Sequence, residues 1–141
     1  MKYVLDASVA FKWEVAETDS DKANLLRDDF RNSIHQLLAP DFFPYELAHA
    51  LTRAERQGRI AIGQARPLWG DAMTTCPVLL PTLSLTTRAI DISSQIRIGV
   101  YDCLYVALAE QEQCQLVTAD DKLVNLLQPT FPQIIHLAAL P

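Results

Sequence analysis

The stretch MKYVLDASVAFKW (residues 1–13) decides the fold, because a short apolar run ends there at a carboxylate. The run YVL consists of residues that favour strands or buried positions, so it predicts a buried strand over residues 2–5. Asp6 follows directly, and small and apolar residues come after it. A carboxylate in such surroundings is costly unless it is paired, hydrogen-bonded or bound to a cation.

The composition fits one domain over residues 1–141, since half of the residues are hydrophobic and a chain of this length can bury a sizeable core. The three cysteines are odd in number and form no CxxC pair, which argues against a disulfide framework or a zinc ribbon. No apolar stretch approaches the ~20 residues that cross a bilayer, and Asp6 and Lys12 interrupt any signal-like N-terminus. We therefore expect a cytoplasmic protein with no membrane segment.

Expected strands alternate with expected helices along the chain. The strands fall at residues 2–5, 38–40, 78–80, 115–118 and 134–137, and the helices at 19–37, 44–57, 62–75, 86–98, 102–112 and 120–127. Pro67 and Gly70 predict a kink, or two short helices, within 62–75. This alternation predicts an α/β fold in which a parallel sheet is covered on both faces. Ligands of such folds bind beyond the carboxyl ends of the strands.

Four acids stand where that crevice would open. Asp6 and Asp120 each follow a short apolar strand, whereas Glu46 and Asp102 lie in apolar helices. Each acid taken singly has a simpler interpretation, as a helix cap, a first-turn residue or a solvent-facing side chain. Taken together, they can converge on one crevice, where cations would have to neutralise them. An all-oxygen ligand set suits Mg²⁺ or Mn²⁺ rather than zinc.

Such a site favours phosphodiester hydrolysis. Two divalent ions about 4 Å apart, or one ion and a second that arrives with substrate, can clamp a phosphodiester and activate a water. No protein nucleophile is needed, which fits the absence of a GxSxG elbow. The four glycines are dispersed, so Rossmann-type oxidoreductases and P-loop NTPases are excluded.

The net charge of −5 argues against a general nucleic-acid binder, but it depends on the four acids. Without them, 13 of the 17 acidic residues remain against 12 basic ones. Arg53 lies seven residues after Glu46 and so shares its helical face. The candidates for substrate binding are Arg53, Arg56 and Lys12. The alternative is that Glu55 and Arg59 form a surface pair and that the other basic residues are solvated.

Four blocks of the chain resemble a known family. They are YVLDASVAFKW (3–13), APDFFPYELAHAL (39–51), YDCLYVALAEQ (101–111) and LVTADDKL (116–123). Together they resemble PIN-domain ribonucleases, and in particular the VapC-type toxins of bacterial toxin–antitoxin pairs. The resemblance implies a three-layer α/β/α sandwich around a parallel sheet. It also implies an endoribonuclease that uses Mg²⁺ or Mn²⁺, forms a homodimer and is silenced by a cognate antitoxin.

The resemblance also implies roles for individual residues. The catalytic and metal-binding acids would be Asp6, Glu46, Asp102 and Asp120, with Asp121 as the alternative to Asp120 because TADDKL holds two adjacent acids. Ser8 and Thr118 would hydrogen-bond the carboxylates or the waters on the metal. Hydrolysis of RNA would then leave a 5′-phosphate and a 3′-hydroxyl.

The same residues argue against other functions. Glu46 and His49 have the spacing of di-iron carboxylate bundles, but those need two such motifs on four long helices. Phosphatases with an aspartyl nucleophile need a second Asp where Ser8 stands. Aromatic residues can stack on bases, although helical spacing favours the core for Trp69 and Tyr105. The remaining alternative is a non-catalytic PIN-like scaffold that binds RNA or a protein partner.

Overall fold

The computed structural model describes all 141 residues and contains one five-stranded sheet, in the order β3-β2-β1-β4-β5. Every neighbouring pair of strands is parallel. The strands are β1 (Lys2–Leu5), β2 (Gln36–Pro40), β3 (Val78–Leu80), β4 (Gln115–Thr118) and β5 (Ile134–His136). The chain runs outward from β1 through β2 to β3 and then returns to the other side of β1 with β4. The strand order therefore reverses at β1, which is the place where α/β sheets open a ligand crevice.

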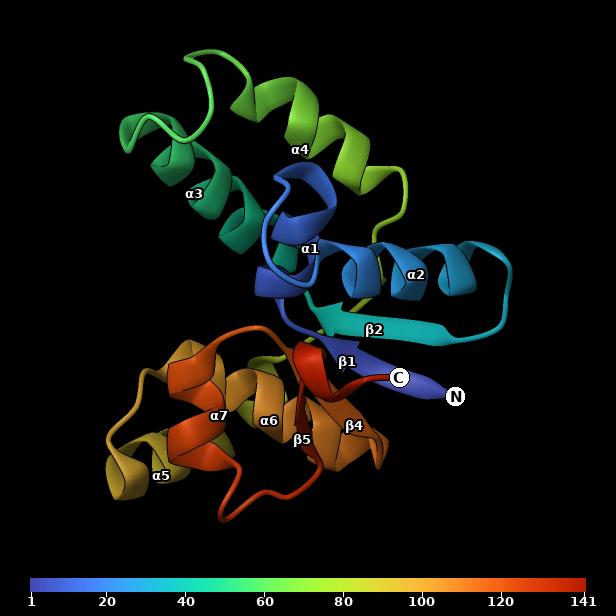
Figure 1. Ribbon diagram of the computed structural model, residues 1–141. Coiled ribbons are helices and arrows are strands. Elements are labelled where there is room, and N and C mark those ends of the chain that lie inside the picture. Colours follow the sequence, from blue (N-terminus) through green and yellow to red (C-terminus); the bar gives the residue numbers. More distant parts are fainter.

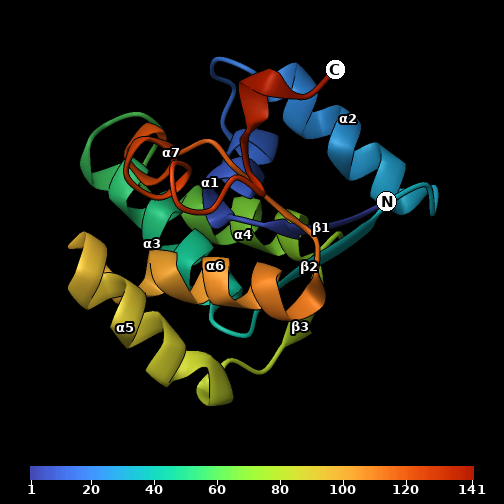
Figure 2. The ribbon, with the colours of Figure 1, turned by 90° about the horizontal axis from the view of Figure 1, so that it is seen from below.

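Helices cover both faces of the sheet (Figure 1). One face carries α1 (Ala7–Glu14), α2 (Ser20–Arg31), α3 (Phe43–Arg56) and α4 (Ala65–Met73). The other carries α5 (Thr86–Ile96), α6 (Val100–Glu112) and α7 (Asp121–Leu127), which lie nearest the viewer in Figure 2. Two short 3₁₀ segments, Leu83–Leu85 and Leu137–Ala139, complete the chain. The predicted three-layer α/β/α sandwich is confirmed.

The central strand contributes to two cores. Tyr3 and Leu5 of β1 pack with the α1–α4 layer, whereas Val4 between them packs with the α5–α7 layer. All three side chains are buried. A parallel strand covered on both faces needs a continuous apolar run rather than an alternating one, which explains the YVL sequence. None of the helices has the length and apolar character needed to span a membrane.

Two expectations about the helices were wrong, and one helix was missed. The helix expected over 19–37 ends at Arg31, because Ser33 adopts a left-handed turn conformation (φ 60°) and the following apolar residues pair with β1. The segment expected to kink is one helix, α4, because Pro67 falls in its first turn, where a missing N–H is tolerated. Helix α1, directly after Asp6, was not expected at all.

Candidate active site

The fold brings the four predicted acids to one cavity of about 750 Å³. Asp6 follows β1, and Asp120 lies two residues beyond the neighbouring strand β4. Glu46 lies in the first turn of α3, and Asp102 lies in the first turn of α6. Four elements that are distant in sequence therefore each place one carboxylate at the carboxyl end of the sheet.

Asp6 is the most enclosed of the four acids, with 7% of the residue exposed. Its Oδ2 accepts hydrogen bonds from Ser8 Oγ at 2.6 Å and from Thr118 Oγ1 at 2.7 Å. The same two hydroxyls accept from the backbone beyond β4, Ser8 from Ala119 N at 3.0 Å and Thr118 from Asp120 N at 3.1 Å. This network fixes Asp6 to the end of β4. Both donors use Oδ2, so no side chain donates to Oδ1.

Glu46 is positioned by a buried phenol. The Tyr105 hydroxyl donates to Glu46 Oε1 at 2.7 Å and accepts from Ala7 N at 3.3 Å. The Tyr105 ring is fully buried, as the sequence pattern predicted, but the contact of its hydroxyl with Glu46 was missed. The available clue was its place three residues after Asp102, on the same side of an apolar helix, since a buried phenol needs a hydrogen-bond partner.

The remaining two acids differ in how they are held. Asp120 Oδ1 accepts from Lys122 N at 2.9 Å and from Leu123 N at 3.3 Å, so this residue caps α7 while it lines the cavity. The Asp102 side chain accepts no hydrogen bond from the protein. Asp121 does not line the cavity, because its exposed carboxylate pairs with His136 at 2.9 Å.

The electrostatics of the cavity are dominated by burial and by repulsion among the acids. Burial raises the pKa of Asp6, although the Ser8 and Thr118 hydrogen bonds oppose the rise. Burial, with repulsion from Asp6 and Asp102, raises the pKa of Glu46 to about 7 against the hydrogen bond from Tyr105. The pKa of Asp102 rises to about 6, again mainly by burial and then through Asp6 and Asp120.

The donor set of the cavity fits a hard divalent cation. The four acids offer only carboxylate oxygens, which Mg²⁺ and Mn²⁺ prefer. They do not form a closed ligand cluster, since no three His, Cys, Asp or Glu side chains of the structure lie close enough together to hold a metal ion. No arginine or lysine side chain forms an ion pair with these acids, although Lys122 opposes the rise in the pKa of Asp102. A bound divalent cation would offset that repulsion.

The basic candidates are only partly near the acids. Arg53 lines the acidic cavity together with His49. Lys12 lines a neighbouring cavity, and Arg56 lines neither. The alternative pairing of Arg59 with Glu55 was wrong.

Arg59 and Glu55 each have another partner. Arg59 Nη2 lies 2.6 Å from Glu17 Oε2. Glu55 Oε1 instead accepts from Gly63 N at 2.9 Å and from Ala65 N at 2.8 Å, so it holds the turn before α4.

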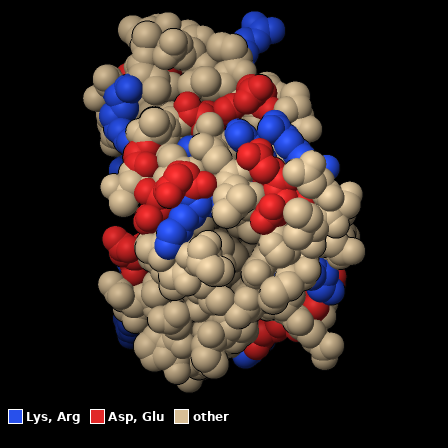
Figure 3. Space-filling view, turned by 45° about the vertical axis from the view of Figure 1, so that its right-hand side comes forward, with Lys and Arg blue, Asp and Glu red and all other residues tan.

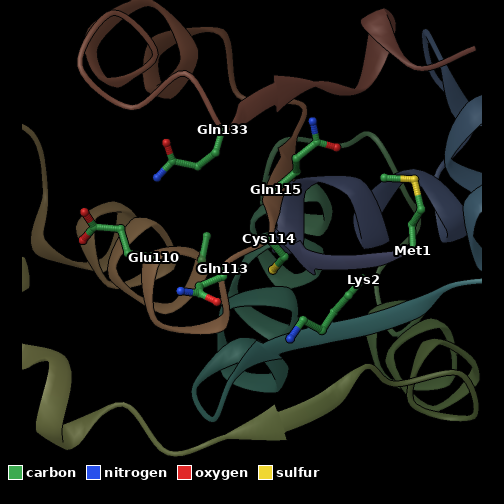
Figure 4. A pocket seen from close by; sticks show the side chains of 8 residues that line it. Met1, Lys2, Glu110, Gln113, Cys114, Gln115 and Gln133 are labelled. Atoms are coloured by element: carbon green, nitrogen blue, oxygen red, sulfur yellow. The ribbon is translucent and has the colours of Figure 1, made fainter.

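The opposite end of the sheet has a different character. A cavity of about 670 Å³ opens there, and its lining includes the side-chain amides of Gln113, Gln115 and Gln133 (Figure 4). Its one acid, Glu110, is paired with Arg88 at 3.0 Å. Of these two cavities, only the one at the carboxyl end of the sheet therefore gathers unpaired carboxylates.

The sequence of the chain matches a family model, that of the PIN domain, over residues 3–126. The chain belongs to the PIN-domain family. PIN domains are in general metal-dependent nucleases, and the acidic cavity described above is the part of this domain that fits such chemistry.

Two solved structures are similar to this PIN domain in fold. The crystal structure of PAE2754 from Pyrobaculum aerophilum has a TM-score of 0.69 at 21% identity, covering 98% of this chain and 93% of that one. VapBC2 from Rickettsia felis, bound to a DNA fragment from its promoter, has a TM-score of 0.62 at 14% identity, covering 96% of this chain and 97% of that one. No curated protein matches the sequence.

Proposed function

We propose that this PIN domain is a metal-dependent endoribonuclease and the toxin of a toxin–antitoxin pair. The observation that carries the proposal is the convergence of four carboxylates from four elements on one cavity, with no arginine or lysine side chain in an ion pair with any of them. Mg²⁺ or Mn²⁺ would be held by the acids Asp6, Glu46, Asp102 and Asp120. When bound, the ion supplies an activated water and stabilises the charge that develops on the phosphodiester.

The chain's own residues orient this site. Ser8 and Thr118 fix Oδ2 of Asp6 and leave Oδ1 without a side-chain donor. Tyr105 fixes one oxygen of Glu46. Oriented carboxylates lower the cost of assembling the site at the moment of reaction. Water attack on phosphorus with departure of the 3′-oxygen would leave a 5′-phosphate and a 3′-hydroxyl.

The first test is cleavage of a structured RNA pool by the purified protein, with Mg²⁺ or Mn²⁺ against EDTA, beside Asp6→Asn. Discrete products that need both the metal and Asp6 would support the nuclease, and mapping their ends tests the expected 5′-phosphates. Absence of metal-dependent products, or equal cleavage by the variant, would contradict it. The protein would then be better explained as a non-catalytic scaffold that binds RNA or a partner.

The toxin role is supported by the fold shared with VapBC2. On this proposal the protein acts in the cytoplasm, where its three free cysteines stay reduced. Induced expression should arrest growth, and Asp6→Asn should not. Co-expression with the product of an adjacent small gene should restore growth and yield a stable complex. Sedimentation of the free protein tests the expected homodimer, and a monomer at micromolar concentration would contradict it.

A further inference from the structure

Two cavities meet along one side of α3. The acidic cavity and a neighbouring one of about 420 Å³ share the lining residues Ser8, His49, Ala50 and Arg53. The neighbour, which we call the basic side cavity, is further lined by Lys12, Glu17, Gln57 and Arg59. An RNA strand that lies in the acidic cavity can therefore continue into the basic side cavity.

The charges of the basic side cavity are opposite to those of its neighbour. It holds Lys12, Arg53 and Arg59, with Glu17 as its one carboxylate. Glu17 bridges two of the cations: Oε1 lies 2.9 Å from Lys12 Nζ, and Oε2 lies 2.6 Å from Arg59 Nη2. Arg53 forms no ion pair in the structure. One carboxylate therefore occupies two cations, and a third stays unpaired beside the acids.

The bridged cations are held in place by further contacts. Lys12 Nζ also donates to Thr18 O at 2.8 Å, and only 11% of its side chain is exposed. The Arg59 guanidinium lies over the Phe11 ring at 5.4 Å. Two cations that face one anionic group from fixed positions form a site that also suits a phosphate, because its oxygens can accept from both.

The surface away from the site offers no alternative basic track on the face drawn in Figure 3. Lysines and arginines are interspersed with acids on the upper part of that face, and its lower part is largely uncharged. The low overall basicity of the chain thus leaves few places where a nucleic-acid backbone can find unopposed positive charge.

We propose that the basic side cavity binds a second phosphate of the RNA strand whose neighbouring phosphodiester lies at the acids, and that Glu17 occupies this phosphate position in the free protein. This inference rests on the proposed function. RNA entry exchanges one anion for another on Lys12 and Arg59, so these two residues add little net affinity while Glu17 is present. Arg53, which has no carboxylate to lose, contributes directly.

The test is RNA binding without cleavage. A fluorescein-labelled single-stranded RNA of about 12 nucleotides, a length within single-strand site sizes, is titrated by anisotropy against Asp6→Asn over a series of salt concentrations. The series is repeated with wild type in EDTA, in case that variant fails to fold. For single strands each phosphate contact contributes about 0.7 to the slope of log K against log salt, or about five-fold in affinity at 0.1 M salt.

Glu17→Gln is expected to bind RNA at least about five-fold more tightly, with a slope steeper by about 0.7 for each cation released. Its matched control is Glu110→Gln, which makes the same charge change in a distant ion pair with Arg88. If both variants gained the same RNA affinity, the gain would come from the change in net charge alone, and the proposal would be overturned. Unchanged or weaker binding by Glu17→Gln would overturn it as well.

Arg53→Gln should weaken binding about five-fold and reduce the slope by about 0.7, whereas Arg56→Gln on the same helix should change little. Equal losses of RNA affinity in Arg53→Gln and Arg56→Gln would overturn the proposal. Binding of polyglutamate, a carboxylate polyanion, without binding of RNA would overturn it as well. The outcome is separable from that of the nuclease. If Glu17→Gln binds RNA more tightly but the protein cleaves no RNA, the phosphate site is supported and the nuclease is not. If the protein cleaves RNA with metal but Glu17→Gln binds no more tightly, only the phosphate site is contradicted.

Discussion

Helix α1 has an acidic cluster at each end. The two clusters both contain carboxyl groups with raised pKa values, but they differ in their neighbouring cations and in whether they line a cavity. Asp6 precedes the helix and belongs to the acidic cavity, whereas Glu14 at its last turn faces Asp71 of α4. Burial, with the neighbouring Asp71, raises the pKa of Glu14 to about 7, the value that Glu46 reaches in the cavity. Raised carboxyl pKa values therefore occur at both ends of α1.

The surroundings separate the two clusters. Arg27 and Arg31 of α2 face Glu14 and oppose the rise in its pKa. One carboxylate oxygen of Glu14 is buried without a hydrogen-bond partner. Neither Glu14 nor Asp71 lines any cavity. No arginine lowers the pKa of Asp6, Glu46 or Asp102, and these acids face a space large enough for a substrate. A perturbed pKa thus identifies a candidate site only together with a cavity and a missing counter-charge.

The largest expected difference between the clusters is in catalysis. Asp6→Asn should reduce metal-dependent RNA cleavage by about 100-fold or more, because a catalytic metal contributes several kcal/mol to transition-state stabilisation. Glu14→Gln should cleave at the wild-type rate. Both rates are measured at saturating Mn²⁺ on one labelled RNA. An inactive but folded Glu14→Gln protein would mean that the two clusters are coupled.

A smaller loss is expected when the support of Asp6 is removed. Thr118→Val deletes one hydroxyl that holds Oδ2, and such changes around metal ligands typically cost 10–100-fold. Thr75→Val is the matched control, since this buried threonine accepts from Arg31 beside the Glu14 cluster. Single-turnover rates and the half-saturating Mn²⁺ concentration are measured for both. A wild-type metal requirement in Thr118→Val would assign its hydroxyl to strand packing alone.

The sequence predicts the cavity better than the Glu14 cluster, and the reason is physical. Asp6 and Asp120 follow buried strands, so the carboxyl ends of neighbouring parallel strands had to bring them together. Glu14 and Asp71 meet because α1 packs against α4. The local sequence pattern predicts neither α1 nor that contact. Helix packing is set by side chains distant in sequence, which no local pattern contains.

The same limit explains the partners that were missed. The Tyr105 hydroxyl reaches Glu46 across the interface of α6 and α3, and Glu17 reaches Arg59 from a loop 42 residues away in sequence. Local periodicity assigns Tyr105 to the core and pairs Arg59 with Glu55 at the favoured helical spacing. In the structure Arg59 lies beyond the end of α3, so that spacing no longer applies.

Metal binding should stabilise the protein through one cluster only. At ten times its dissociation constant, Mg²⁺ or Mn²⁺ adds about 1.4 kcal/mol to the free energy of unfolding, or about 4–6 °C in Tm for a domain of this size. Asp102→Asn should abolish this shift, and Asp71→Asn should retain it. Differential scanning fluorimetry in metal and in EDTA measures both. A shift that survives in Asp102→Asn would place the ion elsewhere.

The smallest expected effect is a pH dependence at the Glu14 cluster. A carboxyl group whose folded pKa is about 7 rather than 4.5 binds its proton more tightly in the folded state. Its contribution to stability is therefore present below about pH 4.5, falls as the pH rises to 7, and is constant above that. Glu14→Gln should remove this fall and raise the free energy of unfolding at pH 8 by about 1 kcal/mol, once solvent screening of a part-exposed group is included.

Urea denaturation at pH 5 and pH 8 measures this change, with Asp21→Asn on the exposed side of α2 as the control. The cavity acids titrate in the same range, so only the difference between variant and wild type isolates Glu14. Asp71→Asn should give a similar gain at pH 8, because it removes the like charge, while Arg27 and Arg31 remain as partners. A loss of stability in Glu14→Gln at pH 8 would instead mean that these arginines need the Glu14 carboxylate, and that the cluster is an ion-pair network.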